Sequence, residues 1–228
     1  MDSEPRPNFV ADVLSYPFRK GGFNMLVVGT ILFVISSLVS YSPFLGGTAS
    51  LFVFAYLCGL YFELVELSSD EDNELFAFPD ISDPMEDIVL PTVKVIGVII
   101  ISFLPLIAWI IWGDDSLPFY NETIYALVAW GTFYIPMAML ATITLGSLRG
   151  AMIHIVLPSI FKAGPLYLLA AFMLGAIYTA EAFAFGYLDQ WPFVTIPAAA
   201  FIAMYALMTN ARTLGLLLQR REEELGWY

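Results

Sequence analysis

Polar side chains inside long apolar runs are the residues of this chain best placed to do chemistry. Glu181 stands alone within Tyr178–Phe183, about 8 residues from the outer boundary at Asp189, which is roughly 12 Å along a helix. An acid at that depth costs about 2.5–3.5 kcal/mol on membrane-insertion scales and marks a candidate proton or cation site, or a subunit contact. The alternative is a protonated acid bonded to a neighbouring hydroxyl, such as that of Tyr134 or Thr132.

A second polar group is expected near the ends of two other apolar runs. Glu63 and Arg212 fall at similar depth, and Asn210 precedes Arg212 by two residues. We predict an ion pair between Glu63 and Arg212 that ties two helices together. The alternatives are Arg212 reaching the membrane surface alone or a polar cavity. With Glu181, these residues form the candidate intramembrane polar site.

The acidic segment 66–87 is the longest stretch outside the apolar runs, and it contains no basic residue. Acidic clusters can bind calcium, but Asp70–Glu74 lacks the glycine that an EF-hand loop requires. We therefore predict a solvated cytoplasmic loop that docks a partner through its apolar residues and one acid, namely Leu75, Phe76, Phe78 and Asp80.

Signals for enzymatic chemistry are absent from the sequence. His154 is the only histidine and Cys58 the only cysteine, so a zinc site, a haem site or a hydrolase triad would lack its partners. Neither a phosphate-binding loop nor a dinucleotide-binding glycine pattern occurs. We predict no catalytic residue, no metal and no cofactor.

The elements that must position these residues are six apolar runs. Of the 228 residues, 59% are hydrophobic and 13% charged, against about 25% charged in soluble proteins. Roughly 20 uncharged residues suffice for a helix to span a bilayer. We predict an all-α membrane protein with a single polytopic domain, 1–228. Its transmembrane helices are expected at 22–40, 46–65, 89–112, 124–148, 165–187 and 191–218.

The positive charges set the predicted orientation. All 9 Lys and Arg residues fall on one side of the six-span arrangement. The positive-inside rule then places both termini in the cytoplasm. We expect the protein to lie in the inner cell membrane. The net charge of −12 argues against nucleic acid as a partner. We expect membrane lipids and other membrane protein subunits as partners.

A weak threefold repeat runs through the chain. Val13–Lys20, Ile88–Lys94 and Ile155–Lys162 each place a lysine shortly after a proline. We interpret the unit as a short interfacial helix, a proline elbow and a helical hairpin, because proline bends a helix. The second unit has a helix start, with Asp83 as N-cap, Pro84 in the first position and Glu86 in the third. The alternative is that Pro and Lys are simply common at membrane boundaries.

The end of the chain carries a resemblance. Asn210–Leu218, followed by Leu225-Gly226-Trp227, resembles the tail of multi-pass proteins of unknown function from bacteria, including planctomycete-like lineages, and from archaea. Tyr16-Pro17 and Phe78-Pro79-Asp80 also suit that group. The resemblance implies a polytopic helical protein and no assigned reaction.

Our leading hypothesis for function is a non-enzymatic accessory or scaffold subunit of a membrane complex. The alternative is a small transporter or channel that uses Glu181 and the group formed by Glu63, Asn210 and Arg212. An intramembrane enzyme is the third hypothesis.

Overall fold

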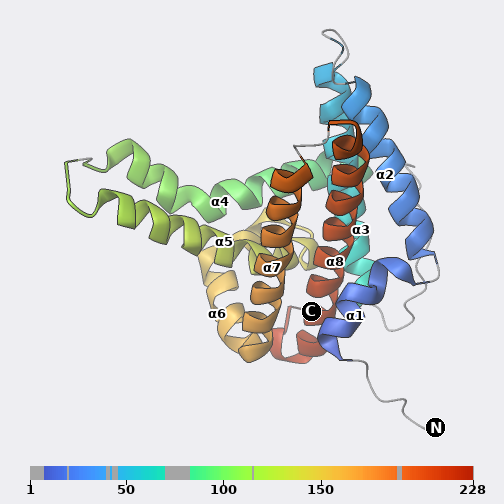
Figure 1. The fold of residues 1–228 in the computed structure, drawn as a ribbon. Helices are drawn as coiled ribbons and strands as arrows, with labels where there is room; N and C mark the ends of the chain where they lie inside the picture. Colours follow the sequence, from blue (N-terminus) through green and yellow to red (C-terminus); the bar gives the residue numbers. More distant parts are fainter. Residues whose placement is uncertain are drawn as a thin grey trace, which may run out of the picture.

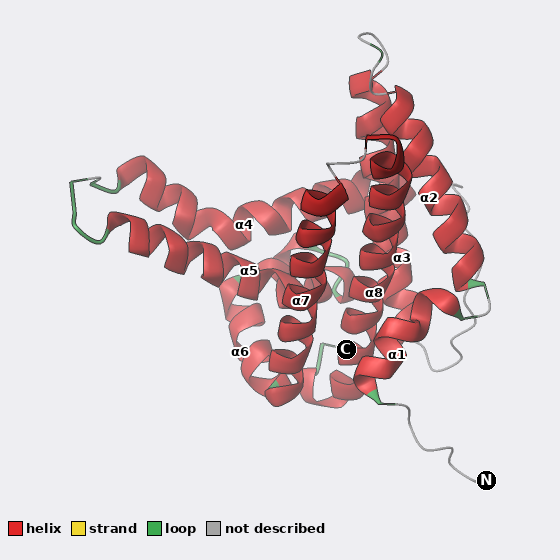
Figure 2. Ribbon diagram, in the orientation of Figure 1, coloured by secondary structure: helices red, strands yellow, loops and turns green. Residues whose placement is uncertain are grey.

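The computed structural model is helical throughout its regular elements (Figure 2). It describes residues 8–19, 21–39, 42, 46–69, 83–114, 116–188 and 192–227. No strand occurs within these ranges. The predicted all-α class is therefore confirmed.

Six helices in the described ranges are long and apolar enough to cross a membrane, which is consistent with an integral membrane protein. They are α2 (Gly22–Val39), α3 (Gly46–Ser69), α4 (Leu90–Trp112), α5 (Tyr120–Thr144), α7 (Pro165–Leu188) and α8 (Pro192–Leu225). Each overlaps one of the six predicted spans.

The helix ends differ from the prediction where local geometry decides. α3 continues through Glu66 to Ser69, so the first residues of the predicted acidic loop are helical. α5 ends at Thr144 rather than 148, because Gly146 adopts a left-handed φ of +63° and terminates the helix. α8 runs on to Leu225, beyond the apolar stretch that predicted it.

Short helices precede the spans at the positions of the predicted elbows. They are α1 (Phe9–Ser15), η1 (Tyr16–Phe18), η2 (Met85–Val89), η3 (Leu148–Ala151) and α6 (Ile153–Ala163). The first unit follows the prediction, with Pro17 in the turn η1 between α1 and α2. In the third, Pro158 lies inside α6, and the break falls at Gly164, whose φ is +56°, before Pro165 begins α7.

The second predicted elbow is wrong. η2 continues directly into α4, and Pro91 lies in the first turn of α4, where a missing N–H costs little. The predicted helix start is nevertheless present: Asp83 accepts a hydrogen bond from the Met85 N–H at 2.9 Å. Asp87, rather than Glu86, accepts the Asp83 N–H at 2.9 Å.

α8 is the central helix. It packs against α3, α7 and α2, and also meets α1 and α6. The approach to α3 is close at Gly215, where an added Cβ would lie 2.3 Å from the Ser68 Cβ and 2.9 Å from the Val65 carbonyl oxygen. Only glycine lets the two helices meet at this distance.

The α4–α5 hairpin leaves this group as an arm (Figure 1). α2, α3, α7 and α8 run roughly along one direction, whereas the arm extends sideways from them. If the three hairpins of the predicted repeat were related by rotation, they would form a compact six-helix bundle. The sideways arm departs from that arrangement. At its base the arm is anchored by Tyr134, whose hydroxyl donates to the Ala151 carbonyl at 2.6 Å. Tyr167 of α7 donates to the Phe133 carbonyl of α5.

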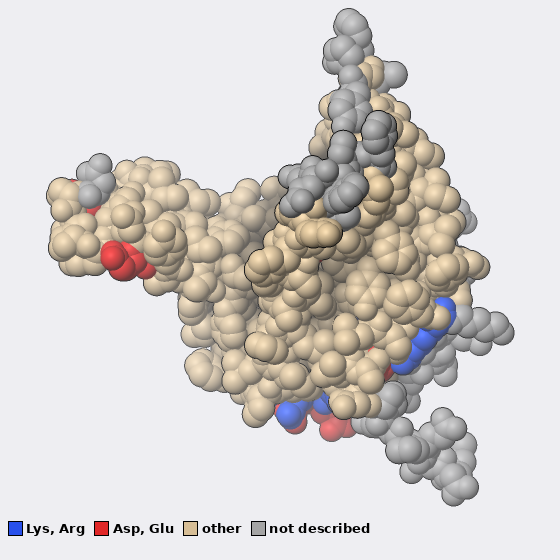
Figure 3. All heavy atoms as spheres, in the orientation of Figure 1, with Lys and Arg blue, Asp and Glu red and all other residues tan. Residues whose placement is uncertain are grey.

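Charged side chains avoid the sides of the helices on the face seen in Figure 3. Lys and Arg gather near its lower edge, by α1, α6 and the end of α8, while acidic side chains appear there and on the arm. This separation leaves a broad uncharged surface over the spans.

Candidate functional site

A cavity of about 800 Å³ lies between the arm and the remaining spans. Residues from all six apolar helices line it. Most of the lining is aliphatic or aromatic, including Phe33, Phe54, Leu57, Val95, Ile99, Phe133, Met139, Leu174 and Leu207. A cavity of this size and composition falls within the range of small-molecule sites.

Polar side chains form a row on one wall of the cavity. The Tyr61 hydroxyl of α3 donates to Asn210 Oδ1 of α8 at 2.8 Å. Asn210 Nδ2 donates in turn to the Tyr178 hydroxyl of α7. The row therefore joins three helices through a single amide, and all three residues line the cavity.

Glu181 extends this row on α7. It lies one turn after Tyr178, and residues three apart share a helix face. Both line the cavity. Among the described residues, Glu181 has no hydrogen-bond or ion-pair partner. The suggested bond to Tyr134 or Thr132 is wrong, because Tyr134 donates to Ala151 and Thr132 donates to the Val128 carbonyl.

The predicted polar site is thus only partly assembled. Glu181 and Asn210 meet the same cavity, whereas Glu63 and Arg212 are outside its lining. A step of two residues on a helix turns the side chain by roughly 200°. Asn210 therefore faces the cavity, and Arg212 faces the other side of α8.

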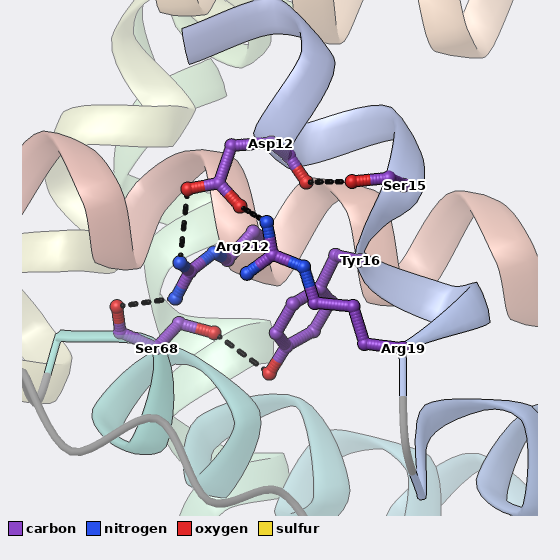
Figure 4. A network of polar contacts seen from close by, with 6 residues as sticks. All are labelled: Asp12, Ser15, Tyr16, Arg19, Ser68 and Arg212. Carbon is purple, nitrogen blue, oxygen red and sulfur yellow. Dashed lines mark hydrogen bonds and ion pairs between the residues drawn. The ribbon is translucent and has the colours of Figure 1, made fainter. Parts of the chain in front are cut away.

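Arg212 pairs with Asp12 of α1 (Figure 4), which corrects the predicted pair with Glu63. Arg212 Nη2 lies 3.1 Å from Asp12 Oδ2, and the two side chains are 2% and 4% exposed. Arg212 Nη1 also donates to the Ser68 carbonyl at the end of α3, at 3.1 Å. Glu63 lies more than one turn before Ser68 on α3, too far back along that helix to serve as the partner.

The Asp12 network binds α1, η1, α3 and α8 together (Figure 4). The other carboxylate oxygen of Asp12 pairs with Arg19, which is more exposed. The Arg212 guanidinium lies over the Tyr16 ring, 5.0 Å from its centroid. The Ser68 hydroxyl donates to the Tyr16 hydroxyl at 3.1 Å. Burial raises the pKa of Tyr16 because it disfavours the phenolate.

Asp12 is the site residue that sequence reasoning missed. The signal was present: Phe9, Asp12, Val13 and Tyr16 are spaced as one face of a helix, and all four are buried. An acid within such an apolar stripe indicates a buried partner. The network fastens α1 to α8 and α3 and lies apart from the cavity.

Other predicted features have less structural support. Glu63 is half-buried on α3, with Glu66 one turn further along. His154 is exposed on α6. The docking residues Leu75, Phe76, Phe78 and Asp80 lie outside the described residues, as does Lys20. Lys162 donates to the Leu225 carbonyl at 3.2 Å, and so holds the end of α8.

No cluster of three or more His, Cys, Asp or Glu residues suited to a metal occurs within the described ranges. No family model, curated protein or solved structure matches the chain. The class of the protein is thus defined by its fold alone: a helical protein with six apolar helices of membrane-spanning length.

Proposed function

We propose that the chain is a non-enzymatic integral membrane protein that binds a lipid-like molecule in the cavity beside the α4–α5 arm. The observation that carries this proposal is the cavity itself, about 800 Å³ of mainly apolar space with one polar row. An apolar site with a few convergent polar groups is the usual form of a small-molecule site.

The cavity opens at the level of the apolar helices. Phe54, Ile99 and Tyr178 line it and are also 44%, 43% and 53% exposed. Exposed aliphatic and aromatic residues on a membrane-spanning helix face lipid tails. A molecule can therefore enter sideways from the bilayer, and its chain would occupy the apolar part while its polar group meets the polar row.

Filling the cavity tests the proposal. Gly175 lines the cavity, and a Cβ added there would meet no atom within 4 Å. Gly186 lies on the same helix outside the cavity lining and is equally open. We expect native mass spectrometry of the detergent-purified protein to show a bound lipid in the wild type and in Gly186→Trp, and to lose it in Gly175→Trp. Equal lipid retention by both variants would contradict a site in the cavity.

The transporter or channel alternative is favoured by one observation, the presence of Glu181 and Asn210 in the same cavity. Flux in proteoliposomes that disappears in Glu181→Ala and survives in Glu122→Ala would support it. Glu63 and Arg212 take no part in this version of the alternative.

The role of accessory or scaffold subunit, the inner-membrane location and the cytoplasmic termini stay predictions. The start of α1 and the end of α8 lie at the same end of the molecule (Figure 1), which supports termini on one side of the membrane. Reporter fusions at both ends test the orientation. Purification in mild detergent tests the subunit role, and a strictly monomeric particle without a partner protein would count against it.

A further inference from the structure

We infer that the ligand of the cavity is an uncharged lipid with a free hydroxyl head group. This inference rests on the proposed function and adds the chemistry of the head group. It is argued from the hydrogen-bonding groups that the polar row leaves available.

The row has a definite direction. Tyr61 donates its proton to Asn210 Oδ1, so the Tyr61 oxygen still has lone pairs that can accept. Tyr178 accepts from Asn210 Nδ2, so the proton of its own hydroxyl is left to donate. Asn210 is 6% exposed, which leaves the two phenols as the groups that a ligand meets.

Glu181 completes the set. Its carboxyl group lines the same cavity and makes no hydrogen bond to any described residue. An ionised carboxyl only accepts, and a protonated one both donates and accepts. The site therefore always offers one donor from Tyr178 and acceptors from Tyr61 and Glu181.

A hydroxyl matches this set in either state of Glu181, because it both accepts and donates. It accepts from the Tyr178 hydroxyl and donates to Glu181 or Tyr61. An ether only accepts, which leaves an ionised Glu181 unmatched, and an ammonium only donates, which leaves the Tyr178 proton unmatched. A carboxylate would bring a second negative charge beside Glu181.

Cys58 provides a reporter within the cavity. It is the only cysteine of the chain, lines the cavity and is 6% exposed. Its rate of alkylation by N-ethylmaleimide can be followed by mass spectrometry in detergent. A ligand in the cavity should slow this reaction.

The test compares four probes of equal chain length: hexadecan-1-ol, its methyl ether, hexadecylamine and hexadecanoic acid. We expect the alcohol to protect Cys58 at about ten-fold lower concentration than the ether, since an unmatched buried polar group costs on the order of 1–3 kcal/mol. In Glu181→Leu the preference should shrink to about two-fold, and in Glu122→Leu, an exposed acid on the arm, it should be unchanged.

The outcomes separate the two proposals. Equal protection by alcohol and ether in the wild type would overturn the hydroxyl assignment and leave lipid binding intact. Stronger protection of Cys58 by the amine or the acid would also overturn the hydroxyl assignment, and would indicate an amine or a carboxyl head group. Protection by none of the four probes would overturn this inference, while lipid loss in Gly175→Trp would still support the cavity as a site.

Discussion

Replacing Asp12 by Asn should release the N-terminal helix α1 from α8. The substitution keeps the size of the side chain and removes its charge, so Arg212, whose side chain is 2% exposed, loses the carboxylate of Asp12. Arg19 also loses its partner, but its side chain is 36% exposed and water can replace the carboxylate. The cost therefore comes mainly from Arg212.

The size of the effect follows from the contacts that remain. Breaking a buried ion pair costs about 3–5 kcal/mol, because the other charge stays buried. Arg212 keeps its other contacts, among them the Ser68 carbonyl and the face of the Tyr16 ring, so we expect the lower end, about 3 kcal/mol. This corresponds to roughly a hundredfold increase in the fraction of molecules with α1 undocked.

Hydrogen exchange of detergent-solubilised protein measures this release directly. Peptides covering α1 and η1 should exchange about a hundredfold faster in Asp12→Asn, while peptides of α5 should not change. The matched control is Glu224→Gln, which breaks the pair with Arg221. Glu224 is 49% exposed, and an exposed pair contributes about 0–1 kcal/mol at most.

A double substitution separates the lost charge from lost packing. Replacing a buried pair by apolar side chains is often neutral or stabilising, so Asp12→Leu with Arg212→Met should restore most of the protection. If α1 exchanges in Asp12→Asn as in the wild type, or if the double variant is no better than the single one, the network does not hold α1.

Three further predictions concern packing, the end of α8 and pH. Gly215→Val should destabilise the protein by about 1–3 kcal/mol, because the α3 backbone cannot move away from the added side chain. Gly186→Ala, in open space, should be neutral or stabilising by up to about 1 kcal/mol. Denaturation midpoints of the two variants and the wild type measure the difference. Lys162→Met should cost about 1 kcal/mol and speed carboxypeptidase cleavage at the end of α8, because the Leu225 carbonyl loses its donor. The raised pKa of Tyr16 means that the folded state holds this proton more tightly than the unfolded chain. The contribution of Tyr16 to the free energy of unfolding is therefore full below about pH 10 and is lost as pH rises through the folded pKa. Above about pH 10 the denaturation midpoint should fall more steeply in the wild type than in Tyr16→Phe.

The six spans were predictable because each is an apolar run long enough to cross a bilayer and nearly free of charged residues. The direction of the α4–α5 arm was not, since apolarity identifies a span without saying what it packs against. α4 shows the difficulty. Ile96, Ile100 and Leu104 are exposed, although large aliphatic residues at this spacing are also typical of a buried helix face. In the structure Gly97 of α4 lies against Leu148, a contact that the sequence does not indicate.

The candidate site was predictable in part for a related reason. Glu181 and Asn210 were found because a polar residue in an apolar run is conspicuous. The pairing of Arg212 was assigned wrongly because the sequence indicates how deep a residue lies along a span but not which way it faces. Glu63 lies at a depth similar to that of Arg212, which is why depth alone predicts it as the partner. The partner came from outside the spans: Asp12 lies on the short helix α1, and the signal was the apolar spacing of that helix rather than of any span.

The central position of α8 accounts for the composition of its closing stretch, Asn210–Leu218. Leu214, Leu216, Leu217 and Leu218 are all buried although they cover every side of the helix, which is possible only for a helix at the centre of a bundle. Gly215 is needed there for the contact with α3. Such a pattern therefore indicates a central helix rather than a reaction, and Asn210 is the one residue of the stretch that lines the cavity.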